Sequence, residues 1–157
     1  MPVFSRFYFL AQPGAGPSIH PGPLMVGGPR LDVEVHVPQP LATLLSQQGK
    51  PIPKPMPGLA LIDTGASITA VDDSVIKSLG VQPIGVTKVH TPSGSAQQNQ
   101  YPVRFIFPGS GLPELTVPQA IGSLLLPQGI VALIGRDALN SLIFVYNGPV
   151  GMITLAI

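Results

Sequence analysis

The stretch Ala60-Leu61-Ile62-Asp63-Thr64-Gly65-Ala66-Ser67 decides how this chain folds and where its chemistry lies. Three apolar residues lead into a carboxylate, and a polar turn that contains a glycine follows. This pattern indicates a buried strand that feeds a turn. A carboxylate at the end of a buried strand is costly unless it has a partner or a function. Asp63 is therefore the first candidate for a catalytic residue.

A second apolar run with a polar end, Ala132-Leu133-Ile134-Gly135-Arg136-Asp137, follows about seventy positions later. Between the two runs, residues 86–91 and 101–107 have the composition of strands and are joined by a polar stretch. We expect them to form a long exposed β-hairpin. Residues 72–79 begin with two aspartates and end before Gly80, which predicts a capped two-turn helix.

Composition limits the class of protein. A chain of 157 residues and 16.3 kDa suits one domain, or one half of a symmetric dimer. The 18 Gly and 20 Pro residues favour short strands and turns over a helical bundle. A formal net charge of +1 without a basic cluster argues against a nucleic-acid partner, and the absence of Cys excludes disulfides and thiol nucleophiles.

The apolar runs also bear on location. All of them are interrupted before the roughly 18 to 20 residues that a membrane span needs. Residues 7–11 are too short for the apolar core of a secretory signal. We therefore expect no membrane span and a cytoplasmic protein.

The chain divides into two parts by composition. Residues 1–30 are expected to be an N-terminal arm, with a Pro/Gly-rich linker at 12–29. Residues 31–157 are expected to be the folded domain, which begins with an alternating strand at 31–37. Residues 38–57 contain six prolines and predict a surface insertion with room for one helical turn. The remaining expected elements are strands at 115–118 and 130–134, a helix at 135–140, and a hairpin of 142–146 with 150–157 around Asn147-Gly148.

The two quoted segments, in this order and spacing with a hairpin between them, resemble the signature segments of the retroviral-type (retropepsin-like) aspartic proteases. The resemblance covers residues 58–157. It implies an all-β, single-lobe acid-protease fold with one or two short helices, completed as a homodimer. The family's chemistry needs two facing carboxylates, and this chain contains a single Asp-Thr-Gly triplet.

The resemblance further implies an aspartic endopeptidase with peptide or protein substrates and no metal or other cofactor. One Asp63 would be ionised and take a proton from water, and the Asp63 of the second subunit would be protonated and polarise the scissile carbonyl. The family assigns Thr64 to a contact that locks the two active-site loops together. Gly65 would let the backbone approach the carboxylates closely.

Further site residues also follow from the resemblance. Ala66 and Ser67 would line the substrate site, together with the tip of a flap at 87–107, for which the candidates are Thr91, Pro92, Ser93 and Gly94. Residues 152–157 are apolar enough to join a sheet between subunits.

The residues expected at the structural base of the site are Gly135, Arg136 and Asp137. In the viral enzymes the corresponding Arg pairs with an Asp four places after the catalytic one, where this chain has Ser67. Arg136 must therefore bind Asp137, a backbone carbonyl or the other subunit.

Other interpretations remain open at this point. Asp63 could simply cap a turn, and the fold could serve as a catalytically silent dimerisation or peptide-binding module. Asp72 and Asp73 are expected to cap a helix. A phosphoryl-transfer enzyme would need a second nearby Asp for magnesium and a phosphate loop, and a serine hydrolase at Ser93 would need a nucleophile elbow; these motifs are missing.

Overall fold

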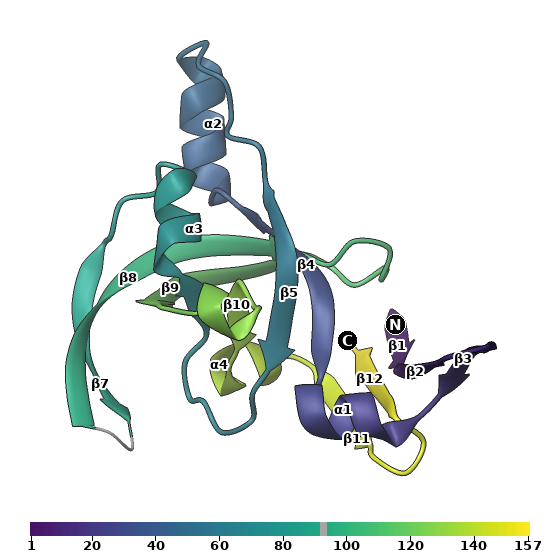
Figure 1. Cartoon of the computed structure of the whole chain (residues 1–157). Coiled ribbons are helices and arrows are strands. Elements are labelled where there is room, and N and C mark those ends of the chain that lie inside the picture. Colours follow the sequence, from purple (N-terminus) through teal and green to yellow (C-terminus); the bar gives the residue numbers. More distant parts are fainter. Residues whose placement is uncertain (92–93) are drawn as a thin grey trace.

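The protein is built mainly from β-sheets, and the computed structural model describes residues 1–91 and 94–157 (Figure 1). The strands of the main sheet are, in spatial order, β4 (Arg30–His36), β5 (Met56–Ile62), β10 (Ala132–Ile134), β6 (Ala70–Asp72), β9 (Leu115–Ser123), β8 (Gly94–Ile106) and β7 (Gly85–Thr91). A smaller sheet contains β1 (Val3–Phe7), β12 (Met152–Ala156) and β11 (Ile143–Asn147), and β2 (Phe9–Gln12) pairs with β3 (Ala15–Ile19). The predicted all-β fold class is confirmed.

The described residues contain more helix than the one or two short helices expected. The helices are α1 (Pro21–Gly27), α2 (Gln39–Gln47), α3 (Asp73–Ser78), α4 (Arg136–Leu139) and the 3-10 turn η1 (Leu126–Gln128). Both α1 and α2 carry Pro in the first turn. A proline there is tolerated because its missing N–H would have no helical partner anyway. The same prolines suggested a linker and a loop from sequence alone, so the expectation of at most one turn within residues 38–57 was wrong.

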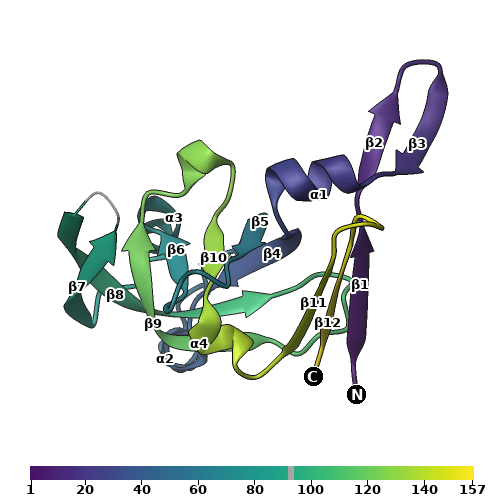
Figure 2. The ribbon, with the colours of Figure 1, turned by 90° about the horizontal axis from the view of Figure 1, so that it is seen from below.

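The N-terminal residues are structured. Strand β1 pairs antiparallel with β12, so the two ends of the chain lie side by side. The β2–β3 hairpin projects beyond α1, and all its residues are exposed (Figure 2). Leu24 of α1 is fully buried in the main core. Residues 12–29 therefore contain a strand and a helix where the sequence suggested a linker; the domain boundary at residue 30 stays a prediction.

Alternate residues of β4 are buried in the main core, as the period of two in the sequence predicted. Leu31, Val33 and Val35 point inward and are at most 2% exposed. They pack in one cluster with fully buried residues of β8, such as Tyr101 and Phe105. Burial of each such side chain contributes roughly 1.5 to 3 kcal/mol.

Strands β5 and β10 are neighbours in the main sheet and form a parallel pair. Ala60 lies opposite Ala132, and Ile62 lies opposite Ile134. Because the strands are parallel and in register, the residues that follow them, Asp63 and Gly135, emerge at the same edge of the sheet. The core thus places the two polar segments of the sequence together.

Strand β9 is longer than the predicted 115–118. Pro118 lies where the pairing with β8 shifts register, between Tyr101↔Ala120 and Val103↔Val117. A bulge accommodates proline without losing a ladder hydrogen bond, so the strand continues past it.

The C-terminal hairpin also differs from the prediction. Asn147 pairs with Met152, so the loop contains four residues and not the two-residue Asn147-Gly148 turn expected. Gly151 takes the left-handed conformation (φ +64°), and a Cβ at this position would lie 2.6 Å from the His20 carbonyl oxygen. A close approach to α1 therefore sets the loop length.

Strand β12 is the central strand of the smaller sheet, with β1 on one side and β11 on the other. It therefore has no free edge in this subunit. An intersubunit sheet would have to form through β1 or β11. No helix of the described residues is long and apolar enough to cross a membrane.

Candidate active site

Asp63 follows β5 directly and is held by the neighbouring strand. Its N–H donates to the Ile134 carbonyl at 2.9 Å. Its Oδ1 accepts from the N–H groups of Gly65 (2.8 Å) and Ala66 (3.3 Å). The turn therefore closes around its own carboxylate, as Asx turns do. Oδ2 makes no hydrogen bond within the described residues, and the residue is half-buried.

This geometry is compatible with both interpretations of Asp63, as a residue that caps a turn and as a catalytic residue. Capping uses one oxygen and leaves the other oxygen available to water or substrate. Glycine at position 65 leaves room for the carboxylate, because a Cβ there would lie 3.0 Å from Asp63 Oδ1 and crowd it. Thr64 is exposed beside it. A residue can thus cap the turn and still present a carboxylate oxygen.

The segment after β10 binds the backbone of this active-site loop. The N–H of Arg136 donates to the Ala66 carbonyl at 2.9 Å, and that of Asp137 donates to the Ser67 carbonyl at 3.2 Å. A Cβ on Gly135 would lie 2.6 Å from the Ile68 carbonyl carbon, too close for any side chain. Glycine at position 135 therefore allows the two segments to touch.

The partner of Arg136 is a pair of backbone carbonyls, one of the three alternatives left open by the sequence. Its Nη1 donates to the oxygens of Thr64 (2.7 Å) and Gly65 (3.0 Å). The guanidinium group thus fixes the peptide groups next to Asp63 from the solvent side. It does so without the carboxylate that the viral pattern supplies.

Thr69 completes the connection and was missed by the sequence analysis. It is fully buried, and both its N–H (2.9 Å) and its hydroxyl (2.7 Å) donate to Asp137 Oδ1. Its Oγ1 also accepts from the Gly135 N–H at 3.1 Å. A polar residue just before an apolar strand, opposite an acid in the first turn of a helix, was the available signal.

A groove of about 520 Å³ opens beside Asp63. Ala66 and Ser67 line it from the active-site loop. Its apolar lining includes Ala70, Ile121 and Leu133, and strands β7 and β8 contribute Lys88, Val89 and Gln98. A smaller apolar cavity of about 270 Å³ lies against Ile62 and Ile134, the residues that precede Asp63 and Gly135.

The expected flap is present as the β7–β8 hairpin (Figure 1). Thr91 and Gly94 pair as its last described residues. Pro92 and Ser93, the other two tip candidates, lie outside the described residues. The contact of the flap tip with substrate stays a prediction.

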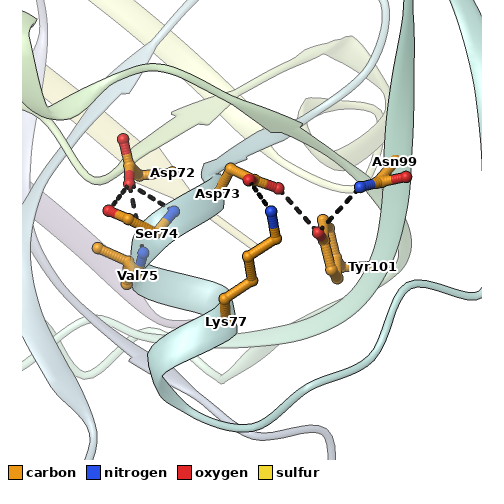
Figure 3. A network of polar contacts seen from close by, with 7 residues as sticks. All are labelled: Asp72, Asp73, Ser74, Val75, Lys77, Asn99 and Tyr101. Atoms are coloured by element: carbon orange, nitrogen blue, oxygen red, sulfur yellow. Dashed lines mark hydrogen bonds and ion pairs between the residues drawn. The ribbon is translucent and has the colours of Figure 1, made fainter.

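The other acidic pair has a structural arrangement (Figure 3). Asp72 is 1% exposed and caps α3: its Oδ1 accepts from the N–H groups of Ser74 (3.0 Å) and Val75 (3.3 Å). Its Oδ2 accepts from Leu125 (2.8 Å) and Leu126 (2.9 Å). Burial alone would raise the pKa of Asp72, but these hydrogen bonds outweigh it and hold the pKa below the usual value. The predicted cap is confirmed.

Asp73 instead anchors the base of the flap (Figure 3). It accepts from the buried Tyr101 hydroxyl at 2.7 Å and pairs with Lys77. Burial, and then the bond to Asp73, raise the pKa of Tyr101. A Cβ on Gly122 would lie 2.6 Å from Tyr101 Cε2, so glycine lets β9 pass close to this pair. The contact joins β8 to α3.

Comparison with known proteins agrees with this geometry. Residues 54–137 match the aspartyl protease family. The chain belongs to this family. The matched range begins before β5 and ends within α4, so it contains both active-site segments. The resemblance to retropepsin-like aspartic proteases is confirmed.

Solved structures of foamy virus proteins are also similar to the chain. The solution structure of the simian foamy virus (mac) protease has 19% identity and a TM-score of 0.43, and the match covers 71% of this chain and 92% of that one. A foamy viral protease-reverse transcriptase in complex with an RNA/DNA hybrid has 19% identity and a TM-score of 0.44, with 71% and 12% covered. No curated protein matches the chain.

Proposed function

We propose that the protein is a homodimeric aspartic endopeptidase in which two Asp63 residues, one per subunit, activate a water molecule. The observation that carries this proposal is the Asp63 carboxylate itself. One oxygen is fixed by Gly65 and Ala66, the other has no partner among the described residues, and Asp63 lines a groove of about 520 Å³. A purely structural aspartate would not need such a groove beside its open oxygen.

The mechanism needs two carboxylates that share one proton, because two such groups at short range do not both ionise. The ionised Asp63 removes a proton from water as the water oxygen attacks the scissile carbonyl carbon. The partner subunit's Asp63, which is protonated, donates its proton to the carbonyl oxygen. The C–N bond of the resulting diol then breaks as a proton passes to the leaving amine, and no acyl-enzyme forms.

The surrounding residues position this pair. The Arg136 side chain and the backbone N–H groups of Arg136 and Asp137 bind the active-site loop. The position of the Asp63 carboxylate is therefore fixed before substrate binds. The flap strands would cover an extended substrate that binds along the groove and would exclude water from the dyad. Apolar lining residues such as Ile121 and Leu133 favour apolar substrate side chains near the scissile bond.

An exposed apolar face on the smaller sheet supports the proposed dimer. Val3 and Ile143 both pair with Ala156, and Val145 pairs with Thr154, so these side chains share one face. Val3, Ile143 and Val145 are 57%, 57% and 46% exposed. This uncharged apolar face, together with the free edges of β1 and β11, suits a symmetric contact between two copies.

The second candidate function is a binding module that captures peptides without cutting them. The observation in its favour is Ser67, which replaces the acid of the viral pattern and leaves Arg136 on backbone carbonyls.

The test of the proposal is digestion of an unbiased peptide mixture by the wild type and by Asp63→Asn, from mildly acidic to neutral pH, with new termini identified by mass spectrometry. Cleavage by the wild type alone supports the protease. Silence from a dimer shown by sedimentation to be intact contradicts the protease and favours the module.

A further inference from the structure

One end of the groove beside Asp63 is polar. In the β8–β9 pair, Gln100 lies opposite Ile121, and two further steps along the same register bring Gln98 opposite Ser123 on the same face. The Ser123 hydroxyl lies 3.4 Å from Gln98 Oε1 and donates to it. Both side chains are half-buried and line the groove that also contains Asp63.

This polar end contrasts with the rest of the groove lining. Ala70, Ile121 and Leu133 provide an apolar floor, with Ala70 and Ile121 directly paired across β6 and β9. A substrate side chain that lies in this groove can contact both the apolar floor and Gln98. Such a side chain gains most if it has an apolar stem and a polar end.

The hydrogen-bonding capacity of Gln98 indicates which polar end fits. A carboxamide has one accepting oxygen and two N–H donors. The oxygen of Gln98 is engaged by Ser123, and its Nε2 makes no hydrogen bond to the described residues. Water can satisfy this group in the open groove, but a bound peptide that excludes the water must offer an acceptor in its place.

We propose that this pocket selects a glutamine side chain of the substrate, and that Gln98 is the specificity-determining residue; the inference rests on the proposed function. The two methylene groups of glutamine would lie on the apolar floor. Its carbonyl would accept from Gln98 Nε2, and its own amide would donate to Ser123 Oγ. Leucine and methionine fill the same space but leave the Gln98 donors without a partner.

Charge favours the neutral amide over the acid. Asp63 carries the catalytic negative charge in the same groove, which disfavours glutamate. Lys88 is exposed on β7 and pairs with Gln97, whereas Gln98 pairs with Thr87. Lys88 also lines the groove, but its side chain is exposed, so solvent weakens its attraction for a glutamate carboxylate.

The strand also supplies a matched control. Gln97 is the neighbour of Gln98 on β8, is exposed, and lies on the opposite face. It does not line the groove that contains Asp63; it lines a second cavity beside Asp73 and Asn99, to which Gln98 and Ser123 also contribute. The same substitution at position 97 changes the flap composition equally and leaves the groove unchanged.

The experiment compares peptides that differ in a single residue, Gln, Glu, Met or Leu, placed in turn at each position flanking the scissile bond. For the wild type, kcat/KM at the selected position should favour Gln over Met by roughly three- to tenfold, the range that one partly solvated hydrogen bond provides. Gln98→Met should abolish or invert this preference, and Gln97→Met should keep it. Equal or better cleavage of the Met peptide by the wild type, or an equal effect of both variants, overturns the inference.

A binding measurement separates this inference from the proposed function. The same labelled peptides are titrated into full-length Asp63→Asn, with and without Gln98→Met, by fluorescence anisotropy. Tighter binding of the Gln peptide that depends on Gln98 supports the pocket even if the wild type never cleaves, which would refute the protease alone. Equal binding of all peptides overturns the pocket, whether or not cleavage occurs.

Discussion

The substitution Thr69→Val tests whether the connection between the two active-site segments stabilises the fold. Thr69 is fully buried, and valine keeps its shape, so no cavity forms. The change removes the hydroxyl that donates to Asp137 at 2.7 Å and accepts from the Gly135 N–H at 3.1 Å. Loss of the first bond costs about 1 kcal/mol, because Asp137 is partly solvated, and an unsatisfied buried N–H costs about 1 to 3 kcal/mol.

The expected total is therefore about 2 to 4 kcal/mol, a large fraction of the roughly 5 to 15 kcal/mol that stabilises a domain. Urea unfolding at fixed protein concentration should show a midpoint lowered by about 1 to 2 M with an unchanged m-value. Thr116→Val, at an exposed position of β9, is the control and should change stability by less than about 0.5 kcal/mol. A loss below about 1 kcal/mol for Thr69→Val, or equal losses for the two variants, would refute the reasoning.

Three other predictions follow from the contacts of the site and the smaller sheet. Asp72 has a lower pKa folded than unfolded, so its stabilisation is present above the usual value of 3.8 and is lost as the pH falls through the folded pKa. Asp72→Asn should therefore flatten the acid side of the stability–pH curve measured by urea unfolding; an unchanged slope below about pH 4 contradicts this. Arg136→Met removes the hydrogen bonds to the carbonyls of Thr64 and Gly65 and should lower kcat/KM at least tenfold. Because Arg136 is exposed, the same substitution should lower the free energy of unfolding by less than about 1 kcal/mol. Activity equal to that of the wild type would contradict the positioning role. Val145→Lys should raise the dimer dissociation constant at least tenfold in sedimentation equilibrium, with the exposed Gln119→Lys of β9 as control, and an intact Val145→Lys dimer would place the interface elsewhere.

The sequence predicted the parts of the fold where local pattern and tertiary role agree. The apolar runs before Asp63 and Gly135 are central strands, and the alternation at 31–37 corresponds to β4. Asp72 caps a helix as its position indicated. In each case the period or the cap is set by the segment's own residues.

The errors arose where distant contacts decide. Proline-rich residues 12–29 and 38–57 contain α1 and α2, because proline is compatible with a first helical turn and Leu24 gains burial in the main core. The Asn147-Gly148 signal was overridden by the close approach of Gly151 to His20. The residues around Thr69 indicate only a polar group before a strand; they do not show that its hydroxyl meets a helix 68 positions later.

The same contacts have a consequence for assembly. Within one subunit, Arg136 and Asp137 already bind the backbone of residues 64–67, and Asp63 already caps its own turn. The conformational entropy of ordering this loop is therefore lost when the subunit folds and not when two subunits meet. In the proposed dimer, association then has to align two preformed half-sites, so substitutions at the proposed interface, such as Val145→Lys, should act on the dimer dissociation constant and leave the activity of the fully assembled dimer nearly unchanged. Arg136→Met should do the reverse, since it loosens the half-site without touching the exposed face of the smaller sheet. A preformed half-site therefore requires that Val145→Lys weakens dimerisation without lowering activity at saturating protein concentration, and that Arg136→Met lowers this activity without weakening dimerisation.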